Sequence, residues 1–344
     1  MQSFETLETY LSQRTDTAEV SQAVAETVVA IASATVEISM VIARGPLAGD
    51  LGASRGDNTD GDVQKELDLV ANDIVIAALQ DAPVAWIVSE ELQDPLQGTV
   101  GAPLGVAIDP LDGSSNIDTN TSVGSIFSVL HAQTDAADST LQPGTQQLAA
   151  GYVIYGPQTT LVLTLGDGTM MFTLDPEQAA FRLTEADVRI PETTREFAIN
   201  ASNFRHWDGP IRAYVDDCLN GEEGFRDSNY NMRWLASLVA ECHRILSRGG
   251  VFLYPSDARK GYAAGRLRLL YEVNPIAFIV EQAGGAGTTG TQRLLEIEPN
   301  GIHERAPMIF GSRREIARVE RYFERTRINA ERSQLFNKRG LFRA

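Results

Sequence analysis

The segment that most constrains the fold lies in the middle of the chain, where short apolar runs alternate with turn residues. Residues 152–155, 160–165 and 169–174 are apolar enough to form strands, and Gly-Pro and Gly-Asp-Gly sequences separate them. Glycine and proline at such positions are typical of hairpin turns. We therefore predict a strand-rich block over residues 122–174.

Other segments have the spacing of amphipathic helices. In residues 24–43 the apolar side chains recur at helical intervals, and Glu26 and Glu37 interrupt the stretch. This pattern predicts a core helix and not a membrane span. Further helices are predicted over residues 63–78, 210–219 and 233–246. Another is expected to start at Asn274, where Pro275 would take the first helical position. A last helix is expected to start at Ser312, because Glu315 stands at capping-box spacing from it.

Helices and strands mix along the chain without strict βαβ alternation. We therefore predict a layered α/β (α+β) class. A polar stretch over residues 184–194 indicates a boundary between an N-terminal domain, 1–190, and a C-terminal domain, 191–344. Outside the central block, strands are predicted over residues 84–88, 104–108, 197–199, 251–254 and 267–271.

The charge of the chain argues against nucleic acids and anionic membranes as partners. The formal net charge is −17, which disfavours nucleic acid and anionic membranes because both are polyanions. Residues 1–100 hold 4 basic and 17 acidic side chains, whereas residues 305–344 hold 11 basic and 4 acidic ones. Because glutamates alternate with the basic residues of that last segment, we interpret it as a solvated helix face or a subunit contact.

The cysteine content and the N-terminal segment indicate in which cellular compartment the protein works. Cys218 and Cys242 are the only cysteines, so neither a disulfide framework nor a zinc site is expected. Residues 1–10 contain no basic side chain, unlike a signal peptide. We therefore expect a cytoplasmic protein.

Carboxylates follow two of the predicted strands directly. Glu90 and Glu91 come after the strand over residues 84–88, and Asp109 and Asp112 come after the strand over residues 104–108. Open sheets place ligands at strand ends. Carboxylates that converge there would repel one another, and hard divalent cations such as Mg²⁺ or Mn²⁺ prefer ligands of this kind. The pattern predicts a metal site.

Gly113, Ser114 and Ser115 follow these acids and have the composition of a phosphate cradle. A flexible backbone with inward amides and two hydroxyl groups suits a phosphate. A metal site beside a phosphate cradle indicates phosphoryl transfer to water.

These motifs resemble those of a known family. The sequence DPLDGSSN at residues 109–116 resembles the signature of the metal-dependent, lithium-sensitive phosphatases, which include inositol monophosphatases and fructose-1,6-bisphosphatases. Residues 252–255, 266–275, 281–285 and 305–307 resemble class 1 fructose-1,6-bisphosphatase in particular, and the similarity runs from about residue 23 to 318. It implies the sugar phosphatase fold, with alternating helix and sheet layers.

The resemblance also implies roles for individual residues. Glu90, Asp109, Asp112, Glu272 and the carbonyl of Leu111 match metal ligands. Glu91 and Asp68 match acids that orient and deprotonate the attacking water, and Asp62 lies on a loop that closes over the site. Residues that match the substrate site are Asp112, Gly113, Ser114 and Ser115 at the sugar and its 1-phosphate, and Asn200, Arg233, Trp234, Tyr254 and Arg266 at the distal phosphate.

The resemblance implies a Mg²⁺-dependent hydrolysis of the 1-phosphate of D-fructose 1,6-bisphosphate, in gluconeogenesis or the Calvin cycle, by a homotetramer in which Arg233 reaches a neighbouring subunit. Three residues differ from those usual in the family. Arg266 stands where a lysine is usual, and Trp234 and Asn203 each stand where a tyrosine is usual. These changes leave sedoheptulose 1,7-bisphosphate open as an alternative or second substrate. An inositol-type monophosphatase and a noncatalytic sugar-phosphate sensor also remain open.

Overall fold

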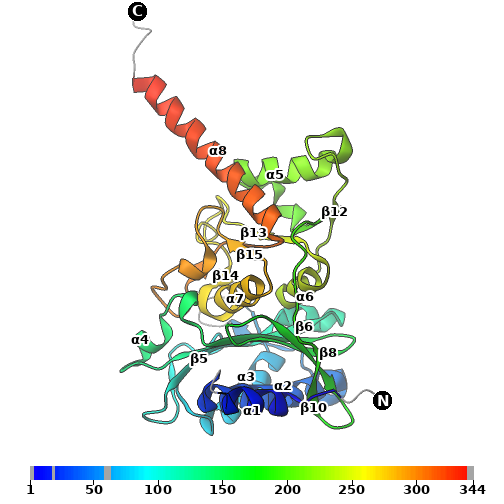
Figure 1. Ribbon diagram of the computed structural model, residues 1–344, viewed down its shortest axis with the longest axis vertical. Coiled ribbons are helices and arrows are strands. Elements are labelled where there is room, and N and C mark those ends of the chain that lie inside the picture. The colour runs from blue at the N-terminus through cyan, green and yellow to red at the C-terminus, as the bar shows by residue number, and fades with distance from the viewer. Residues whose placement is uncertain (1–3, 18–19, 58–62, 339–344) are drawn as a thin grey trace, which may run out of the picture.

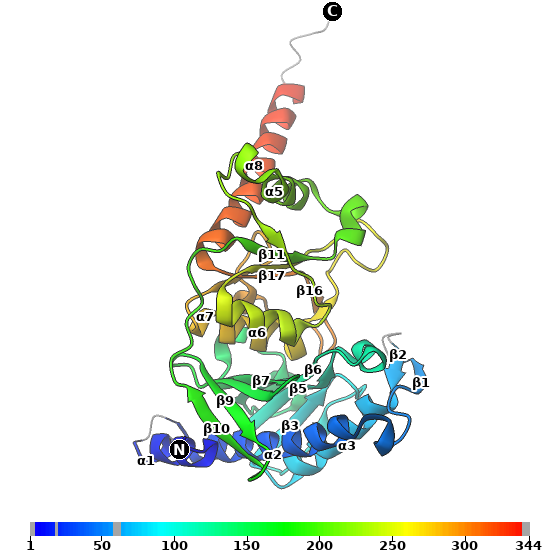
Figure 2. The same ribbon diagram turned by 90° about the vertical axis from the view of Figure 1, so that its right-hand side faces the viewer.

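The chain folds into alternating layers of helix and sheet. The structure is a computed structural model that describes residues 4–17, 20–57 and 63–338. Helices α1, α2 and α3 cover one face of an eight-stranded sheet, α6 and α7 lie between that sheet and a five-stranded one, and α5 and α8 cover the outer face of the second sheet (Figures 1 and 2). The predicted layered α/β class is confirmed.

The eight-stranded sheet has the order β10-β9-β8-β7-β6-β5-β3-β4. Only β3 and β5 pair in parallel within it, and all its other neighbours are antiparallel. The strand-rich block predicted over residues 122–174 supplies β6 to β9, and its apolar runs are almost completely buried. The strands are β3 (Val84–Ser89), β4 (Leu96–Gln97), β5 (Leu104–Asp112), β6 (Val123–His131), β7 (Ala149–Tyr155), β8 (Thr159–Thr164), β9 (Met170–Asp175) and β10 (Ala180–Glu185).

The first helical layer consists of α1 (Leu7–Asp16), α2 (Gln22–Arg44) and α3 (Glu66–Gln80). With η1 (Gly45–Ala48), α2 is long and apolar enough to span a membrane by length and composition alone. Val28, Ile31 and Ile38 on one face of α2 are buried against α3 and the sheet. Packing of this face into the core explains the apolar composition of the helix. A short hairpin, β1 (Ser54–Asp57) and β2 (Val63–Lys65), precedes α3.

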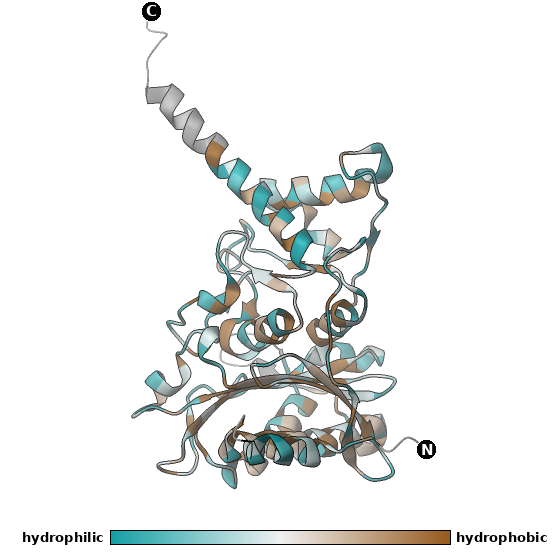
Figure 3. Cartoon of the chain, viewed as in Figure 1, coloured by the Kyte–Doolittle hydropathy of each residue, from teal (hydrophilic) through white to brown (hydrophobic). Residues whose placement is uncertain are grey.

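The second sheet has the order β12-β11-β13-β17-β15. Its strands are β11 (Glu196–Ile199), β12 (Asn231–Met232), β13 (Val251–Tyr254), β15 (Ala286–Thr288) and β17 (Met308–Gly311). The middle helices α6 (Leu238–Arg248) and α7 (Asn274–Gln282) contact both sheets. Of the helices around the second sheet, α7 is the most apolar and α8 (Arg313–Lys338) the most hydrophilic, whereas α6 and α5 (Gly209–Asn220) carry both kinds of side chain (Figure 3). Short elements complete the chain: α4 (Ala136–Thr140), β14 (Leu267–Arg268), β16 (Arg305–Ala306), η2 (Ser114–Thr119), η3 (Gly144–Gln146), η4 (Ala201–His206), η5 (Gly221–Glu223), η6 (Leu269–Val273) and η7 (Leu294–Glu296).

Two predicted elements around the middle layer were wrong in part. The helix predicted over residues 233–246 begins only at Leu238, because Ser237 caps it, and residues 233–236 form an irregular segment that follows β12. The strand predicted over residues 267–271 ends at Arg268. The π-helix η6 begins at the next residue and is continuous with α7. Asn274 therefore continues a helix and does not cap one.

The capping box predicted at the start of α8 does not form. The helix begins at Arg313 as expected, but the N–H of Ser312 donates to the carbonyl of Gly250 at 2.9 Å. The carboxylate of Glu315 instead accepts a hydrogen bond from Arg226 at 2.7 Å and another from Arg318 at 2.7 Å. A tertiary ion pair has replaced the local cap.

Candidate active site

The site begins where the only parallel pair of the eight-stranded sheet ends. Ser89 pairs with Ile108, so Glu90 and Asp109, the next residue of each strand, lie side by side at the same edge. The N–H of Glu90 donates to the carbonyl of Ile108 at 3.1 Å and continues the ladder past the end of β3. Parallel pairing therefore brings together two carboxylates that are distant in the sequence.

Asp109 and Asp112 belong to β5 itself and not to a loop after it, so the strand predicted to end at residue 108 is longer than expected. The register with β6 breaks between these two aspartates, where Pro110 has no N–H to donate. Asp109 Oδ1 accepts the N–H of Leu111 at 2.9 Å. Asp112 Oδ2 accepts the N–H of Val239 at 3.3 Å, in the first turn of α6. This contact joins the sheet edge to the middle helical layer.

Glu272 reaches the same place from η6, which packs against β5 and β6. Its Oε2 accepts the N–H of Arg268 at 2.5 Å. The Arg268 guanidinium, 2% exposed, lies with its Nε 3.4 Å from Glu90 Oε1. Insertion of a π-turn into a helix shifts the side chains that follow, and such turns are frequent at functional sites.

The four acids share one electrostatic environment. Burial raises the pKa of Glu90 to about 7 and that of Asp112 to about 6. Burial and the neighbouring carboxylates, Glu90 first, hold the pKa values of Asp109 and Glu272 well above their ordinary range. The buried guanidinium of Arg268 lies among these acids. The cluster therefore has a surplus of negative charge that burial makes costly.

Two further predicted acids flank the cluster. Asp68, 2% exposed, accepts the N–H of Lys65 through Oδ2 at 2.6 Å at the start of α3, while its buried Oδ1 has no hydrogen-bond partner among the described residues. Burial, together with the charge of Glu91, raises the pKa of Asp68 to about 7. The carboxylate of Glu91 accepts a hydrogen bond from the side chain of Gln64. Asp62, predicted on a closing loop, lies outside the described residues.

The predicted phosphate cradle forms a tight turn after β5. Gly113 has φ +79°, a left-handed conformation that favours glycine, and it leads into η2. Ser114 is half-buried and Ser115 is exposed in this turn. The side-chain amide of Asn116 donates to the carbonyl of Ala236 at 3.0 Å. The turn is therefore tied to the segment that precedes α6.

The residues predicted for the distal phosphate come from the edge of the second sheet. Asn200 and Tyr254 line one small crevice with Asn203 and Arg259. Trp234 stacks on Phe252, with ring centroids 6.0 Å apart, and its ring lies 6.1 Å from that of Tyr254. The guanidinium of Arg266 contacts the ring of Tyr262 at 4.8 Å and lowers the pKa of Tyr254, although burial leaves that pKa raised overall.

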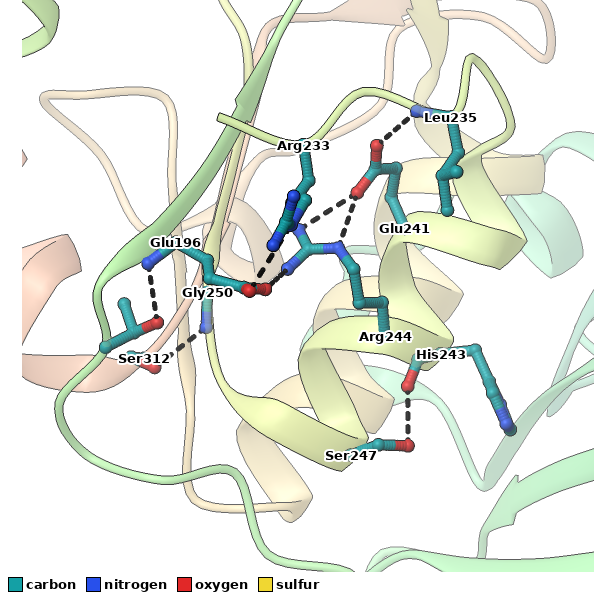
Figure 4. Close-up of polar contacts among 10 residues, drawn as sticks. Glu196, Arg233, Leu235, Glu241, His243, Arg244, Ser247, Gly250 and Ser312 are labelled. Carbon is teal, nitrogen blue, oxygen red and sulfur yellow. Dashed lines mark hydrogen bonds and ion pairs between the residues drawn. The ribbon is translucent and has the colours of Figure 1, made fainter. Parts of the chain in front are cut away.

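Arg233 is held in a chain of ion pairs that ends in the core (Figure 4). Its Nε lies 3.4 Å from Glu196 Oε1, and Arg244 bridges Glu196 at 2.7 Å to Glu241 at 3.0 Å. The fully buried Glu241 in turn accepts the N–H of Leu235 at 2.7 Å. Figure 4 shows that these contacts fasten the segment carrying Arg233 and Trp234 to α6.

Comparison with known proteins identifies the family. The model described as "Fructose-1-6-bisphosphatase, N-terminal domain" matches residues 5–186, and that described as "Fructose-1-6-bisphosphatase, C-terminal domain" matches residues 190–324. The chain belongs to the fructose-1,6-bisphosphatase family. The predicted resemblance is thereby confirmed.

Individual members of the fructose-1,6-bisphosphatase family match over almost the full length. The class 1 fructose-1,6-bisphosphatase of Methylobacterium radiotolerans is 54% identical over 341 residues, which are 98% of this chain and 97% of that protein. The class 1 enzyme of Rhizobium meliloti is 53% identical over 345 residues, covering 98% and 99%. The crystal structure of the fructose-1,6-bisphosphatase of Leishmania major in holo form has a TM-score of 0.87 at 34% identity, covering 94% of this chain and 99% of that one.

The sequence analysis missed one buried residue of the fructose-1,6-bisphosphatase site. Arg268 lies among the predicted acids, yet only Arg266 was singled out in the same Arg-Leu-Arg motif. The strand predicted over residues 267–271 continued past Arg268, whereas β14 ends at Arg268 and η6 begins at Leu269. The available signal in the sequence was a second arginine two residues from an expected substrate ligand.

The acids have the composition of a site for a hard divalent cation, because every side-chain donor in the cluster is a carboxylate oxygen. Their raised pKa values report a surplus of negative charge that a cation would offset. Among the described residues, no three His, Cys, Asp or Glu side chains stand close enough to hold an ion as they are.

Proposed function

We propose that the chain hydrolyses the 1-phosphate of D-fructose 1,6-bisphosphate to fructose 6-phosphate and phosphate. Family membership makes it a phosphoric monoester hydrolase. The observation that carries the specific activity is the buried carboxylate cluster at the ends of β3 and β5, in a chain that matches class 1 fructose-1,6-bisphosphatases along almost its whole length.

Mg²⁺, or Mn²⁺ in its place, is the proposed cofactor. Glu90, Asp109, Asp112, Glu272 and the carbonyl of Leu111 would hold it. Such a cation, when bound, neutralises phosphate charge and acidifies the attacking water. The remaining chemistry falls to the chain itself: Glu91 and Asp68 would orient and deprotonate that water. A pKa of about 7 for Asp68 suits proton exchange near neutral pH.

The substrate would lie between the cluster and the edge of the second sheet. Asp112, Gly113, Ser114 and Ser115 would hold the sugar and the 1-phosphate. At the other end, Asn200, Arg233, Trp234, Tyr254 and Arg266 would hold the second phosphate, with guanidinium groups supplying a planar fork for its oxygens. Cationic groups at that end would attract an anionic substrate to a protein of net charge −17.

A substrate comparison tests the proposal against its alternatives. Phosphate release is measured from fructose 1,6-bisphosphate, sedoheptulose 1,7-bisphosphate and inositol monophosphate, with Mg²⁺ and with a chelator. We expect Mg²⁺-dependent release from the fructose substrate to be fastest. Faster release from the seven-carbon sugar would favour the sedoheptulose assignment, and a preference for the inositol ester would favour a monophosphatase. No release from any of them would favour a sugar-phosphate sensor.

A change at Glu241 tests how Arg233 is positioned. In Glu241→Gln, Arg244 loses one of its two charged partners and keeps Glu196, and the segment from Arg233 to Leu235 loses part of its anchor. We expect KM for the bisphosphate to rise about tenfold, because a charge-assisted hydrogen bond contributes about 1.5–3 kcal/mol, while kcat changes little. The matched control is Glu177→Gln, a surface glutamate. A lowered kcat with unchanged KM would contradict this role.

We expect AMP to inhibit weakly or not at all. The AMP site of the family is matched by residues 17–21 and by Pro103-Leu104, where a glycine of the turn and a Lys-Tyr pair have been replaced. Residues 18 and 19 lie outside the described residues, and Ser21 caps α2 by accepting the N–H of Val24 at 3.3 Å. Initial rates titrated with AMP should give an inhibition constant above about 1 mM. Micromolar inhibition would overturn this expectation.

The remaining proposals concern organisation. We propose domains over residues 1–190 and 191–344, and the change from one family model to the other between residues 186 and 190 supports that boundary. We further propose a homotetramer in the cytoplasm, acting in gluconeogenesis or the Calvin cycle, with no nucleic acid or membrane partner. Sedimentation velocity would test the assembly.

A further inference from the structure

A second cavity lies on the opposite side of the five-stranded sheet from the middle helices. It occupies about 260 Å³ and is lined by residues of α5, of the turn after η5 and of α8. These elements belong to the outer helical layer (Figures 1 and 2). None of its lining residues belongs to the candidate active site. The cavity is lined by Asp217, Phe225, Arg226, Arg318, Arg321, Tyr322 and Arg325.

The back of the cavity contains a buried arginine with unused donors. The side chain of Arg226 is 3% exposed, and one of its terminal nitrogens donates to Glu315 at 2.7 Å. The guanidinium lies 4.5 Å from the ring centre of Tyr214 and 4.7 Å from that of Tyr230, so aromatic rings hold its plane in place. Its Nε and its second terminal nitrogen have no hydrogen-bond acceptor among the described residues. Buried donors without acceptors are rare and indicate an absent ligand or water.

The front of the cavity is formed by arginines from one face of α8. Arg318, Arg321 and Arg325 recur at the spacing that places side chains on the same side of a helix. Arg318 pairs with Glu315 at 2.7 Å, whereas Arg321 and Arg325 are exposed and form no ion pair within the described part of the chain. Two guanidinium groups therefore remain free to bind an anion.

Acidic groups near the cavity are already engaged. Glu315 accepts from both Arg226 and Arg318, and Asp217 accepts the hydroxyl of Tyr322. The lining itself contains four arginines and one aspartate, so its formal charge is positive in a protein of net charge −17. Phe225, 92% exposed, and Tyr322 add apolar walls.

We propose that this cavity binds a small phosphate-bearing metabolite at a site separate from the active site. Guanidinium groups match phosphate oxygens in a two-pronged geometry, and four arginines at one small cavity exceed what the local carboxylates require. The volume is at the lower end of that of ligand cavities, which suits a compact molecule. The phosphate group would accept from the unused donors of Arg226 at the back of the cavity and from Arg321 and Arg325 at the front. The remainder of the molecule would contact Phe225.

The proposal is tested by phosphate binding to the wild type and to four variants of the full chain. Inorganic phosphate and pyrophosphate are titrated calorimetrically, with chloride added to keep the ionic strength constant. The cavity variant is Arg321→Gln/Arg325→Gln. Its matched control is Arg313→Gln/Arg314→Gln, which removes the same charge from the exposed first turn of the same helix. Arg266→Gln marks the proposed substrate site.

We expect the cavity variant to lose at least tenfold in affinity at one phosphate site, and the first-turn control to retain it. Arg266→Gln should retain that site as well, which separates this proposal from the proposed function. Arg226→Lys, which preserves the charge but removes the unused planar donors, should weaken binding while leaving the fold intact by circular dichroism. Equal binding by the cavity variant and the wild type would overturn the proposal, and so would an equal loss in the first-turn control.

Discussion

Asp109→Asn is expected to reduce turnover about a thousandfold and, at the same time, to stabilise the protein when no metal is present. The substitution removes a proposed metal ligand, which explains the loss of activity. Asp109 is also 3% exposed, and the charges of Glu90, Asp112 and Glu272 act against its ionised form. Asparagine is nearly isosteric and can still accept the N–H of Leu111. We therefore expect the free energy of unfolding to rise by about 1–3 kcal/mol in a chelator at pH 8.

The raised pKa of Asp109 also predicts how the stability difference between wild type and variant changes with pH. Because the pKa of Asp109 is raised in the folded protein, the folded state binds more protons than the unfolded state. The wild type therefore loses stability as the pH rises above the ordinary aspartate range, and the variant escapes this loss. Thermal melts in a chelator should differ at pH 8 and converge near pH 4.

The control for Asp109→Asn is Asp94→Asn, which removes the same charge from an exposed position. Melts should also be repeated with Mg²⁺, which is expected to raise the melting temperature of the wild type and not that of Asp109→Asn, because only a cation that binds the folded state stabilises it. A variant that keeps full activity would refute the metal assignment. A variant that melts below the wild type at pH 8 would refute the repulsion argument.

Glu315→Gln is expected to have the largest effect on stability among single changes outside the active site. Glu315 is 4% exposed, and its carboxylate accepts hydrogen bonds from Arg226, Arg318, Tyr214 and Tyr230. The substitution leaves the buried guanidinium of Arg226 without its counter-charge. Removal of one partner from a buried ion pair costs about 3–5 kcal/mol, which urea denaturation would measure.

The matched change Glu320→Gln, at an exposed position on the same helix, should alter the free energy of unfolding by less than about 0.5 kcal/mol. The double variant Arg226→Met/Glu315→Leu should regain much of the loss, because it removes both charges together. If the double variant is as unstable as Glu315→Gln, packing and not the ion pair stabilises the contact between Arg226 and α8. A Glu315→Gln variant with the stability of the wild type would also show that the ion pair contributes little.

Local patterns in the sequence predicted most of the elements of the first sheet and the helices that cover it. Apolar spacing in residues 24–43 identified α2, and the turn residues between 155 and 169 identified the hairpins of β7 to β9. These elements are periodic over a length sufficient for burial of one face to decide their structure. Prediction failed where tertiary contacts replaced local ones: the capping-box spacing at Ser312 was correct for the helix start, yet Glu315 pairs with Arg226.

The sequence by itself determined the chemical character of the candidate active site. Glu90, Asp109 and Asp112 were found because each follows or ends an apolar strand, and their motif was specific enough to identify the family before the fold was known. The tertiary structure decided what surrounds them. Parallel pairing of β3 and β5 sets Glu90 beside Asp109, and the π-turn of η6 brings Glu272 and buries Arg268 against them. Partners far apart in the chain leave no local periodicity, because their contact depends on pairing and packing of whole elements.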